Sequence, residues 1–232
     1  MARRIFTFEG GDGSGKSTLY RHLLSFLQNE RKTTSVFEYK EPGGSVLGQT
    51  CRARLIEAGK PEEPGICLGF EASLFWTGRF QNFHQFSREL AAVEDGVVLT
   101  DRSFASSVAY QIYGRQSFRM HQLFDFMLES LLGELVQVVP DVELYHFFVA
   151  TTPEVAAKRR QGRGADDGPE QFNQLKFQQR VFAGFNIFFE ELAMGMHTVP
   201  GLRVHKAFLL DGDQSEHEVW VQARHALLTI GV

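Results

Sequence analysis

The chain has 232 residues, of which 43% are hydrophobic and 22% charged, and its formal net charge is −4. This composition is typical of a globular protein and excludes disordered and collagen-like chains. The acidic balance gives no support to a nucleic-acid polymer as a partner. The two cysteines, Cys51 and Cys67, lack metal-ligand spacing and indicate a reducing compartment.

The N-terminal segment MARRIFTFEGG contains two arginines with no apolar segment behind them, so we expect no signal peptide. No stretch approaches the roughly 20 apolar residues that a membrane span requires. We therefore expect a cytoplasmic protein with no membrane and no nucleic-acid polymer as a partner.

Predicted strands and helices alternate along the chain. Short apolar runs predict strands at 3–9, 33–39, 97–100, 143–150 and 204–210. Helical spacing predicts helices at 17–31, 48–58, 66–93, 103–113, 118–136 and 171–192, one more after Thr152-Pro153, and a last one capped by Ser215. The alternation predicts an α/β fold of three layers with a five-stranded parallel sheet, in one domain spanning 1–232.

The strongest motif lies between the first strand and the first helix. Residues 10–17 read G-G-D-G-S-G-K-S and match the phosphate-binding loop G-x-x-x-x-G-K-[ST], which indicates the P-loop NTPase fold. Backbone N–H groups and the helix N-terminus would hold the phosphates of a nucleoside triphosphate. The nucleotide-binding residues expected here are Gly10, Gly11, Asp12, Gly13, Ser14, Gly15, Lys16, Ser17 and Thr18. The alternative is a glycine-rich turn with a chance lysine.

Within this loop, Lys16 is expected to reach the β- and γ-phosphates, and the Ser17 hydroxyl to hold Mg²⁺. Asp101 directly follows the apolar strand 97–100 and is a candidate to hold Mg²⁺ from behind its directly bound ligands. Any buried strand can end in aspartate, so this pattern alone is a weak indication of a metal site. It becomes stronger because the phosphate-binding loop is present in the same chain.

Three further blocks follow the phosphate-binding block 8–18 in order: 41–45 (EPGGS) with Gly48 and Arg52, 71–79 (EASLFWTGR), and 101–110 (DRSFASSVAY). With them the chain resembles the thymidylate kinase family over essentially its whole length. The resemblance implies ATP-dependent phosphorylation of dTMP to dTDP with Mg²⁺, by a homodimer formed through the long helices.

The resemblance also implies roles in the acceptor site. Phe75 and Arg79 lie one turn apart on the predicted long helix, and the family likeness implies that Phe75 stacks on thymine while Arg79 donates to O4 or to the acceptor phosphate. The alternative is a core phenylalanine and a solvated charge at the rim.

Four other side chains have roles implied by the same likeness. Arg102 and Arg52 would hold the acceptor phosphate, although each could instead form a surface salt bridge. Asp12 would meet the 3′-hydroxyl, and Tyr110 would crowd C2′ and favour deoxyribose. The remaining acceptor-site residues expected are Pro42, Ser106 and Ser107.

A basic, glycine-rich run at 158–164 predicts a mobile lid over about 158–170. The variable positions 11–14 of the phosphate-binding loop carry no arginine, so we expect a catalytic arginine from the lid, with Arg163 as first choice. Arg159 matches the family position that stacks on adenine. The alternative is a solvated helix end, where cations favour the helix dipole.

Some positions depart from the family pattern. Lys40, Gln49 and Ser107 replace the usual residues, and 166–168 lacks an arginine that commonly follows the lid aspartate. The lid chemistry and the strictness of base choice therefore stay open. A kinase for another or a C5-modified deoxynucleoside monophosphate remains an alternative. A P-loop switch or ATPase is more remote, because no N-K-x-D motif for guanine occurs.

Overall fold

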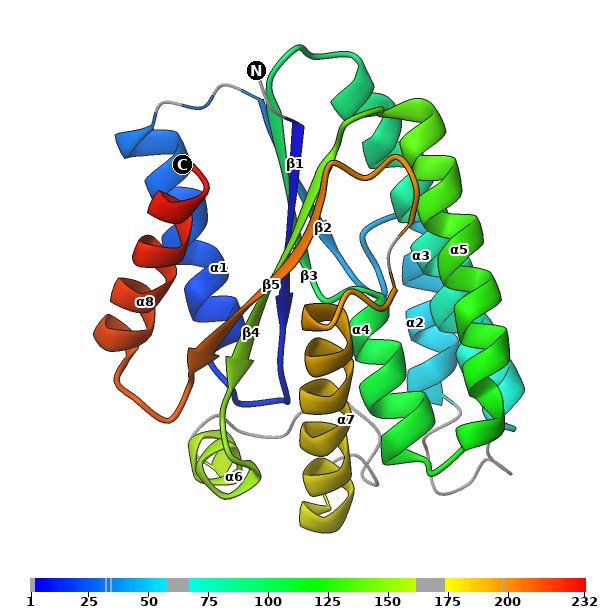
Figure 1. Cartoon of the computed structure of the whole chain (residues 1–232). Coiled ribbons are helices and arrows are strands. Elements are labelled where there is room, and N and C mark those ends of the chain that lie inside the picture. The colour runs from blue at the N-terminus through cyan, green and yellow to red at the C-terminus, as the bar shows by residue number, and fades with distance from the viewer. Residues whose placement is uncertain (1–2, 32, 34, 58–66, 162–173, 198) are drawn as a thin grey trace.

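The computed structural model describes residues 3–31, 33, 35–57, 67–161, 174–197 and 199–232. A sheet of five parallel strands lies at its centre, with the strand order β2-β3-β1-β4-β5 (Figure 1). The strands are β1 (Arg3–Glu9), β2 (Val36–Lys40), β3 (Gly96–Asp101), β4 (Glu143–Ala150) and β5 (Val204–Asp211). The predicted five-stranded parallel sheet is confirmed.

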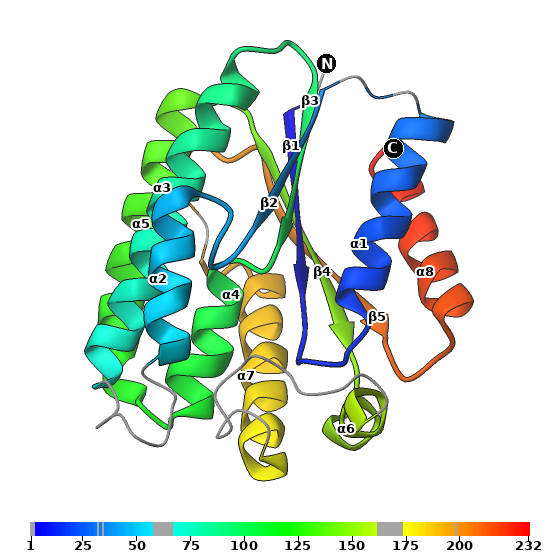
Figure 2. The same cartoon turned by 180° about the vertical axis from the view of Figure 1, so that it is seen from behind.

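Helices cover both faces of the sheet, as the two opposite views show (Figures 1 and 2). The helices α1 (Lys16–Ser25) and α8 (Glu216–Thr229) cover one face. The other face is covered by α2 (Val46–Glu57), α3 (Leu68–Ala91), α4 (Phe104–Ser107), α5 (His121–Val138) and α7 (Leu175–Ala193). A shorter helix, α6 (Pro153–Gln161), lies beyond the carboxyl edge of the sheet. The three-layer prediction is therefore confirmed.

The side-chain alternation of the strands divides the core into two parts. On β1, Ile5 belongs to the apolar cluster beneath α3, α5 and α7, whereas its neighbours Phe6 and Phe8 belong to the cluster beneath α1 and α8. All three side chains are fully buried. Because both faces are covered, the central strands β3 and β4 are buried along almost their whole length, as expected for a parallel sheet between two layers of helices.

Several element boundaries differ from the sequence prediction. Strand β2 begins at Val36, where pairing with Val97 starts, so the predicted start at residue 33 is wrong. The helix predicted at 103–113 is α4 followed by a π-helical turn, Val108–Gly114. The capping box at Ser215 is confirmed, since Ser215 and Glu218 bond to each other's backbone N–H. Among the helices that the structure describes, none has the length and apolar character needed to cross a membrane.

The strand register brings the functional segments to one edge. Lys40 and Phe8 both pair with Asp101, so β2, β3 and β1 end at the same level. Ligands of open α/β sheets bind beyond the carboxyl ends of the strands. The loops that follow Glu9, Lys40 and Asp101 therefore form the candidate site.

Candidate active site

The phosphate-binding loop connects β1 to α1 and depends on glycine for its shape. Gly10 has φ of 145°, and a Cβ at that position would lie 2.8 Å from the Val149 carbonyl oxygen. Gly15 has φ of 98° but faces open space, so only its backbone conformation requires glycine. The loop thus combines tight packing against β4 with an open mouth at the N-terminus of α1.

Lys16 opens α1 and is buried beneath the loop. Its Nζ donates to the Gly11 carbonyl at 3.4 Å and lies 3.6 Å from Asp12 Oδ1. Burial and the nearby Arg102 charge lower the pKa of Lys16, and the Asp12 carboxylate counteracts them. The ammonium group is thus held at the loop, where a bound phosphate would supply further compensating charge.

Two oxygens beside the loop fit a magnesium site. Ser17 lies exposed on the first turn of α1, directly after Lys16. Asp101 ends β3, and its Oδ1 is buried with no hydrogen-bond partner among the described residues. Buried oxygens are rarely left unpaired, and carboxylate and hydroxyl oxygens are the ligands that Mg²⁺ prefers. The residues present therefore fit the ion.

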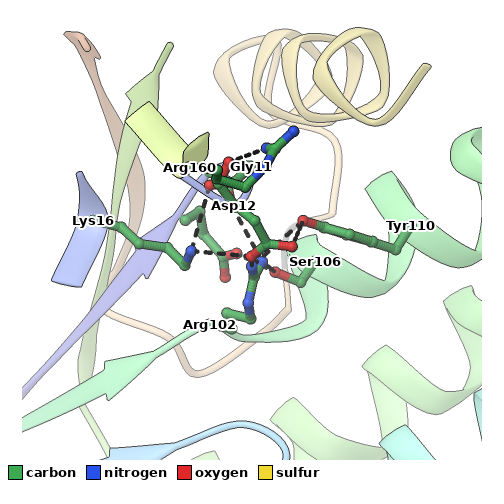
Figure 3. A network of polar contacts seen from close by, with 9 residues as sticks. Gly11, Asp12, Lys16, Arg102, Ser106, Tyr110 and Arg160 are labelled. Carbon is green, nitrogen blue, oxygen red and sulfur yellow. Dashed lines mark hydrogen bonds and ion pairs between the residues drawn. The ribbon is translucent and has the colours of Figure 1, made fainter. Parts of the chain in front are cut away.

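Asp12 stands at the centre of a polar cluster (Figure 3). Arg102 Nη2 donates to its Oδ1, and the Tyr110 hydroxyl donates to its Oδ2 at 3.2 Å. The Arg102 guanidinium also lies 5.1 Å from the centre of the Tyr110 ring. Burial alone would raise the pKa of Asp12, but the charges of Arg102 and Lys16 lower it to about 2. Asp12 is therefore an anion that orients Arg102 and Tyr110.

The backbone of Arg102 adopts the left-handed conformation, with φ of 75°. Its N–H donates to the Phe8 carbonyl at 3.0 Å, and its carbonyl accepts from Thr100 Oγ1 at 3.0 Å. Its Nη1 donates to the Gly10 carbonyl at 3.2 Å. Such strain in a non-glycine residue persists where surrounding contacts fix it, often at functional sites. Here the contacts aim the guanidinium at the phosphate-binding loop.

Arg79 lies in a second, deeper cluster and is only 1% exposed. Its Nε donates to Glu41 at 2.8 Å, its Nη1 to Ser107 at 3.0 Å and its Nη2 to the Ser103 carbonyl at 3.1 Å. A second contact joins Nη2 to Glu41 at 2.7 Å. The alternative of a solvated charge at the rim is therefore wrong. These contacts use the Nε hydrogen, both Nη2 hydrogens and one on Nη1, which leaves one Nη1 hydrogen beyond them.

Three other predicted acceptor-site residues surround this cluster. Phe75 lies one turn before Arg79 on α3 and is partly exposed. Pro42 follows β2 after a cis peptide bond with Glu41. Arg52, on α2, lies beside Gly43 in the same loop, since a Cβ on Gly43 would be 3.6 Å from Arg52 Cδ.

A pocket opens on the other side of the loop. It is lined by Ser14, Gly15, Thr18, Leu19, His22, Arg159, Gln214, Ser215, Glu216, Val219 and Trp220. Arg159 donates to the carbonyls of Gly212 and Gln214 at 2.7 and 3.1 Å, and to that of Ser14 at 3.4 Å. Its guanidinium is thereby fixed at the pocket wall, where the sequence prediction puts adenine.

The lid arginines divide between the described and undescribed parts of the chain. Arg163, the first choice for catalysis, lies outside the described residues, as does most of the predicted lid. Arg160, at the end of α6, donates to the Asp12 carbonyl (Figure 3). It also covers Gly13, where a Cβ would lie 3.0 Å from Arg160 Cγ.

Two buried carboxylates were absent from the predicted site residues. Glu9 ends β1 and accepts from Ser103 and Ser106, and Glu41 follows β2 and pairs with Arg79. A charged residue at the end of an apolar strand next to a functional loop is a signal that could have identified both. The partners of these carboxylates lie far away in the sequence and gave no such signal.

Comparison with known proteins gives consistent results. The family model described as thymidylate kinase matches residues 8–203. A thymidylate kinase of Oleidesulfovibrio alaskensis is 32% identical over 97% of this chain and 98% of its own length. One of Carboxydothermus hydrogenoformans is 33% identical over 80% and 83%. The crystal structure of thymidylate kinase from Ehrlichia chaffeensis has a similar fold, with a TM-score of 0.65, 24% identity and coverage of 98% of this chain and 100% of that one.

Proposed function

This chain belongs to the thymidylate kinase family, and on that premise we propose that it transfers the γ-phosphoryl group of ATP to dTMP, giving dTDP and ADP. It is a nucleoside monophosphate kinase by family. The observation that carries the proposal is the cluster in which Arg102 and Tyr110 bond to Asp12 of the phosphate-binding loop. A P-loop protein that only hydrolyses or binds ATP has no use for such a clamp.

On the donor side, Lys16 and the loop N–H groups would hold the β- and γ-phosphates. The Ser17 hydroxyl and the Asp101 carboxylate, whose Oδ1 has no partner among the described residues, would hold Mg²⁺. When bound, Mg²⁺ would supply the positive charge that offsets the negative charge of the phosphates during transfer. The adenine ring would stack on the guanidinium of Arg159, which is fixed by its bonds to the Gly212 and Gln214 carbonyls.

On the acceptor side, Arg102 would hold the phosphate of dTMP, assisted by Arg52. Asp12, anionic at neutral pH, would accept a hydrogen bond from the 3′-hydroxyl. Tyr110 is held against Asp12 and Arg102, which supports its role at C2′ of the sugar. Catalysis of this kind consists of positioning and charge neutralisation.

The thymine ring would stack on Phe75 and lie near Arg79, with Pro42, Ser106 and Ser107 completing the acceptor site. Arg79 keeps one Nη1 hydrogen beyond its contacts with Glu41, Ser103 and Ser107, enough for one bond to O4. A cytosine carries an amino group at C4, which would place its own N–H donors against the Nη1 hydrogen of Arg79. We therefore expect dCMP to be used at least tenfold less well than dTMP, since unpaired buried donors cost about 1–3 kcal/mol.

We further propose that residues 1–232 form one catalytic domain in which about 158–170 acts as the lid. Arg163 is the proposed catalytic arginine. Arg160 has a different proposed role, because its bond to the Asp12 carbonyl ties α6 to the phosphate-binding loop. Closure of such a lid would exclude water from the transferred group.

The test is a coupled ADP-release assay on one preparation with dTMP, dUMP, dCMP, dGMP, dAMP and a C5-enlarged dUMP. We expect the highest kcat/KM with dTMP and weaker but measurable use of dUMP. A higher value with dGMP or dAMP would leave only the broader monophosphate kinase. ADP release that no nucleotide acceptor stimulates would favour an ATPase instead.

We also propose a cytoplasmic homodimer formed through the α3 and α5 side of the molecule. These helices lie side by side (Figures 1 and 2). Four large apolar side chains on or next to them are 44% to 65% exposed, namely Phe70, Phe118, Leu123 and Phe126. Exposed aromatic clusters mark interfaces. Sedimentation should show a dimer that Phe126→Glu dissociates, while Leu228→Glu on α8 leaves it intact. A monomeric wild type would refute this proposal.

A further inference from the structure

Glu9 is a buried carboxylate that the proposed mechanism leaves without a task. It is the last residue of β1, directly before the phosphate-binding loop, and is 0% exposed. Its Oε1 accepts from Ser103 Oγ at 2.6 Å, and its Oε2 from Ser106 Oγ at 2.6 Å. Burying a carboxylate is costly unless its partners are well arranged. If position 9 only filled the core, an apolar side chain would suffice there.

The hydrogen bonds of Ser106 reveal how Glu9 can reach the acceptor site. Ser106 Oγ also lies 3.2 Å from Nη1 of Arg102. A guanidinium has only donors, so Ser106 must accept from Arg102. Its single proton is then free to go to Glu9, as the distance of 2.6 Å requires. Arg102 therefore donates to Ser106, and Ser106 donates to Glu9. We call this chain of two hydrogen bonds the relay, and its direction is fixed because the Glu9 carboxylate can only accept.

The charges around Glu9 come from three elements. Arg102 attracts it from the turn after β3, Lys16 from the start of α1, and Glu41 repels it from the turn after β2. Burial raises the pKa of Glu9 to about 7, while its bonds to Ser103 and Ser106 and the charge of Arg102 oppose that rise. The ionised form thus depends on the same contacts that aim Arg102.

We infer that Glu9 is a positioning residue for the acceptor phosphate: through Ser106 it fixes the orientation in which Arg102 receives the nucleoside monophosphate. The inference rests on the proposed function and names a residue that acts behind Arg102. A protonated or amide group at position 9 would place a donor against Ser103 or Ser106. Either way the negative charge behind the relay is lost, and the Arg102 guanidinium gains freedom to rotate.

The experiment compares wild type with Glu9→Gln, Ser106→Ala and the double variant. Glu143→Gln is the matched control, because Glu143 is also a buried carboxylate at a strand end, paired with Arg4 at the opposite edge of the sheet. For each protein, KM for dTMP, KM for ATP and kcat are measured at pH 8, together with Tm. Calorimetric binding of dTMP is measured in parallel.

We expect Glu9→Gln to raise KM for dTMP about tenfold, the size of a lost charge-assisted hydrogen bond, with KM for ATP changed less than about twofold. The double variant should be no worse than the more affected single variant, because both act on one relay. Glu143→Gln should match wild type in both constants. The inference would be overturned if Glu9→Gln raised KM for dTMP and KM for ATP equally. It would also be overturned if the rise in KM for dTMP in the double variant equalled the product of the rises in the two single variants.

The two proposals can fail separately. If another nucleoside monophosphate is the better acceptor, the proposed function is corrected, and the Glu9 comparison is repeated with that nucleotide. If dTMP is phosphorylated and also bound equally well by wild type and Glu9→Gln, only the positioning role falls. Calorimetric binding separates the cases even where turnover is too slow to measure.

Discussion

The Arg160 guanidinium donates to the backbone carbonyl of Asp12, so the last turn of α6 is tied to the phosphate-binding loop. This contact comes from the described part of the proposed lid, a few residues before Arg163. The arrangement gives the two arginines separable roles. Arg160 holds the loop through this contact, and Arg163 is proposed to act on the transferred phosphoryl group.

The first prediction separates these roles by substitution. Arg163→Ala should lower kcat about 100-fold with little change in the acceptor KM, because its contact would form only in the transition state. Arg160→Ala should lower kcat/KM for ATP about tenfold through the loosened loop. Steady-state kinetics on both variants decide the matter. A larger kcat loss in Arg160→Ala would make Arg160 the catalytic arginine.

Lys16 provides the second prediction. The Nζ group is held at the Gly11 carbonyl and near Asp12, where its charge would meet the transferred phosphoryl group. Lys16→Met keeps the length and apolar stem but removes the charge. We expect a loss of at least 1,000-fold in kcat, about 4 kcal/mol of transition-state stabilisation, with a normal circular dichroism spectrum. A folded Lys16→Met protein with near-normal turnover would refute the role.

A third prediction concerns the choice of sugar. Tyr110 is 7% exposed, and its hydroxyl is fixed by Asp12, so the ring cannot swing away from the site. Tyr110→Ala should narrow the preference for dTMP over its ribose counterpart, because the space beside C2′ opens. Tyr110→Phe keeps the ring and should keep the preference while losing the bond to Asp12. Ratios of kcat/KM for the two sugars measure this, and an unchanged ratio in Tyr110→Ala removes the residue from the sugar site.

Much of the architecture could be predicted from periodicity, because the central strands are buried on both faces and the long helices α3, α5 and α7 each bury an apolar face. The phosphate-binding loop was equally predictable, since its glycines, Lys16 and Ser17 are contiguous. The burial of Arg79 was not, because it depends on Glu41, 38 residues earlier in the chain. The left-handed backbone of Arg102 gave no sequence signal either, since no glycine marks it. Both features depend on contacts between segments that are distant in the sequence, and local sequence patterns do not report such contacts.

The fourth prediction tests the buried pair of Arg79 and Glu41. Both side chains are nearly inaccessible, and removal of one charge leaves the other uncompensated. Glu41→Gln should therefore destabilise the fold by about 3–5 kcal/mol, which lowers Tm by roughly 10 °C in a protein of this size. Glu38→Gln, at an exposed position on the strand that precedes Glu41, is the control and should change Tm by less than about 2 °C. Similar Tm values for the two variants would contradict the assignment.

A chain of histidines in the core leads to the final prediction. His205 Nδ1 lies 3.1 Å from the His197 carbonyl and must donate to it. His205 Nε2 then accepts from His146 Nε2 at 3.0 Å, and His146 Nδ1 accepts from Thr7 Oγ1 at 2.6 Å. With both rings neutral every one of these bonds is satisfied, and burial disfavours the charged form of each ring.

Burial accordingly lowers the pKa of His205 to about 4 and that of His146 well below its usual value. The unfolded chain takes up protons near pH 6.5 and the folded chain does not, so this stabilisation is complete above pH 6.5 and is lost as the pH falls toward 4. For His205 the loss between pH 7 and pH 5 is about 2 kcal/mol. Urea unfolding at both pH values should show at least that loss in wild type, because His146 adds to it, and the same loss in His217→Gln, an exposed control. His205→Gln should lose about 2 kcal/mol less than wild type over the same interval. An equal pH dependence in wild type and His205→Gln would show that His205 is protonated in the folded protein.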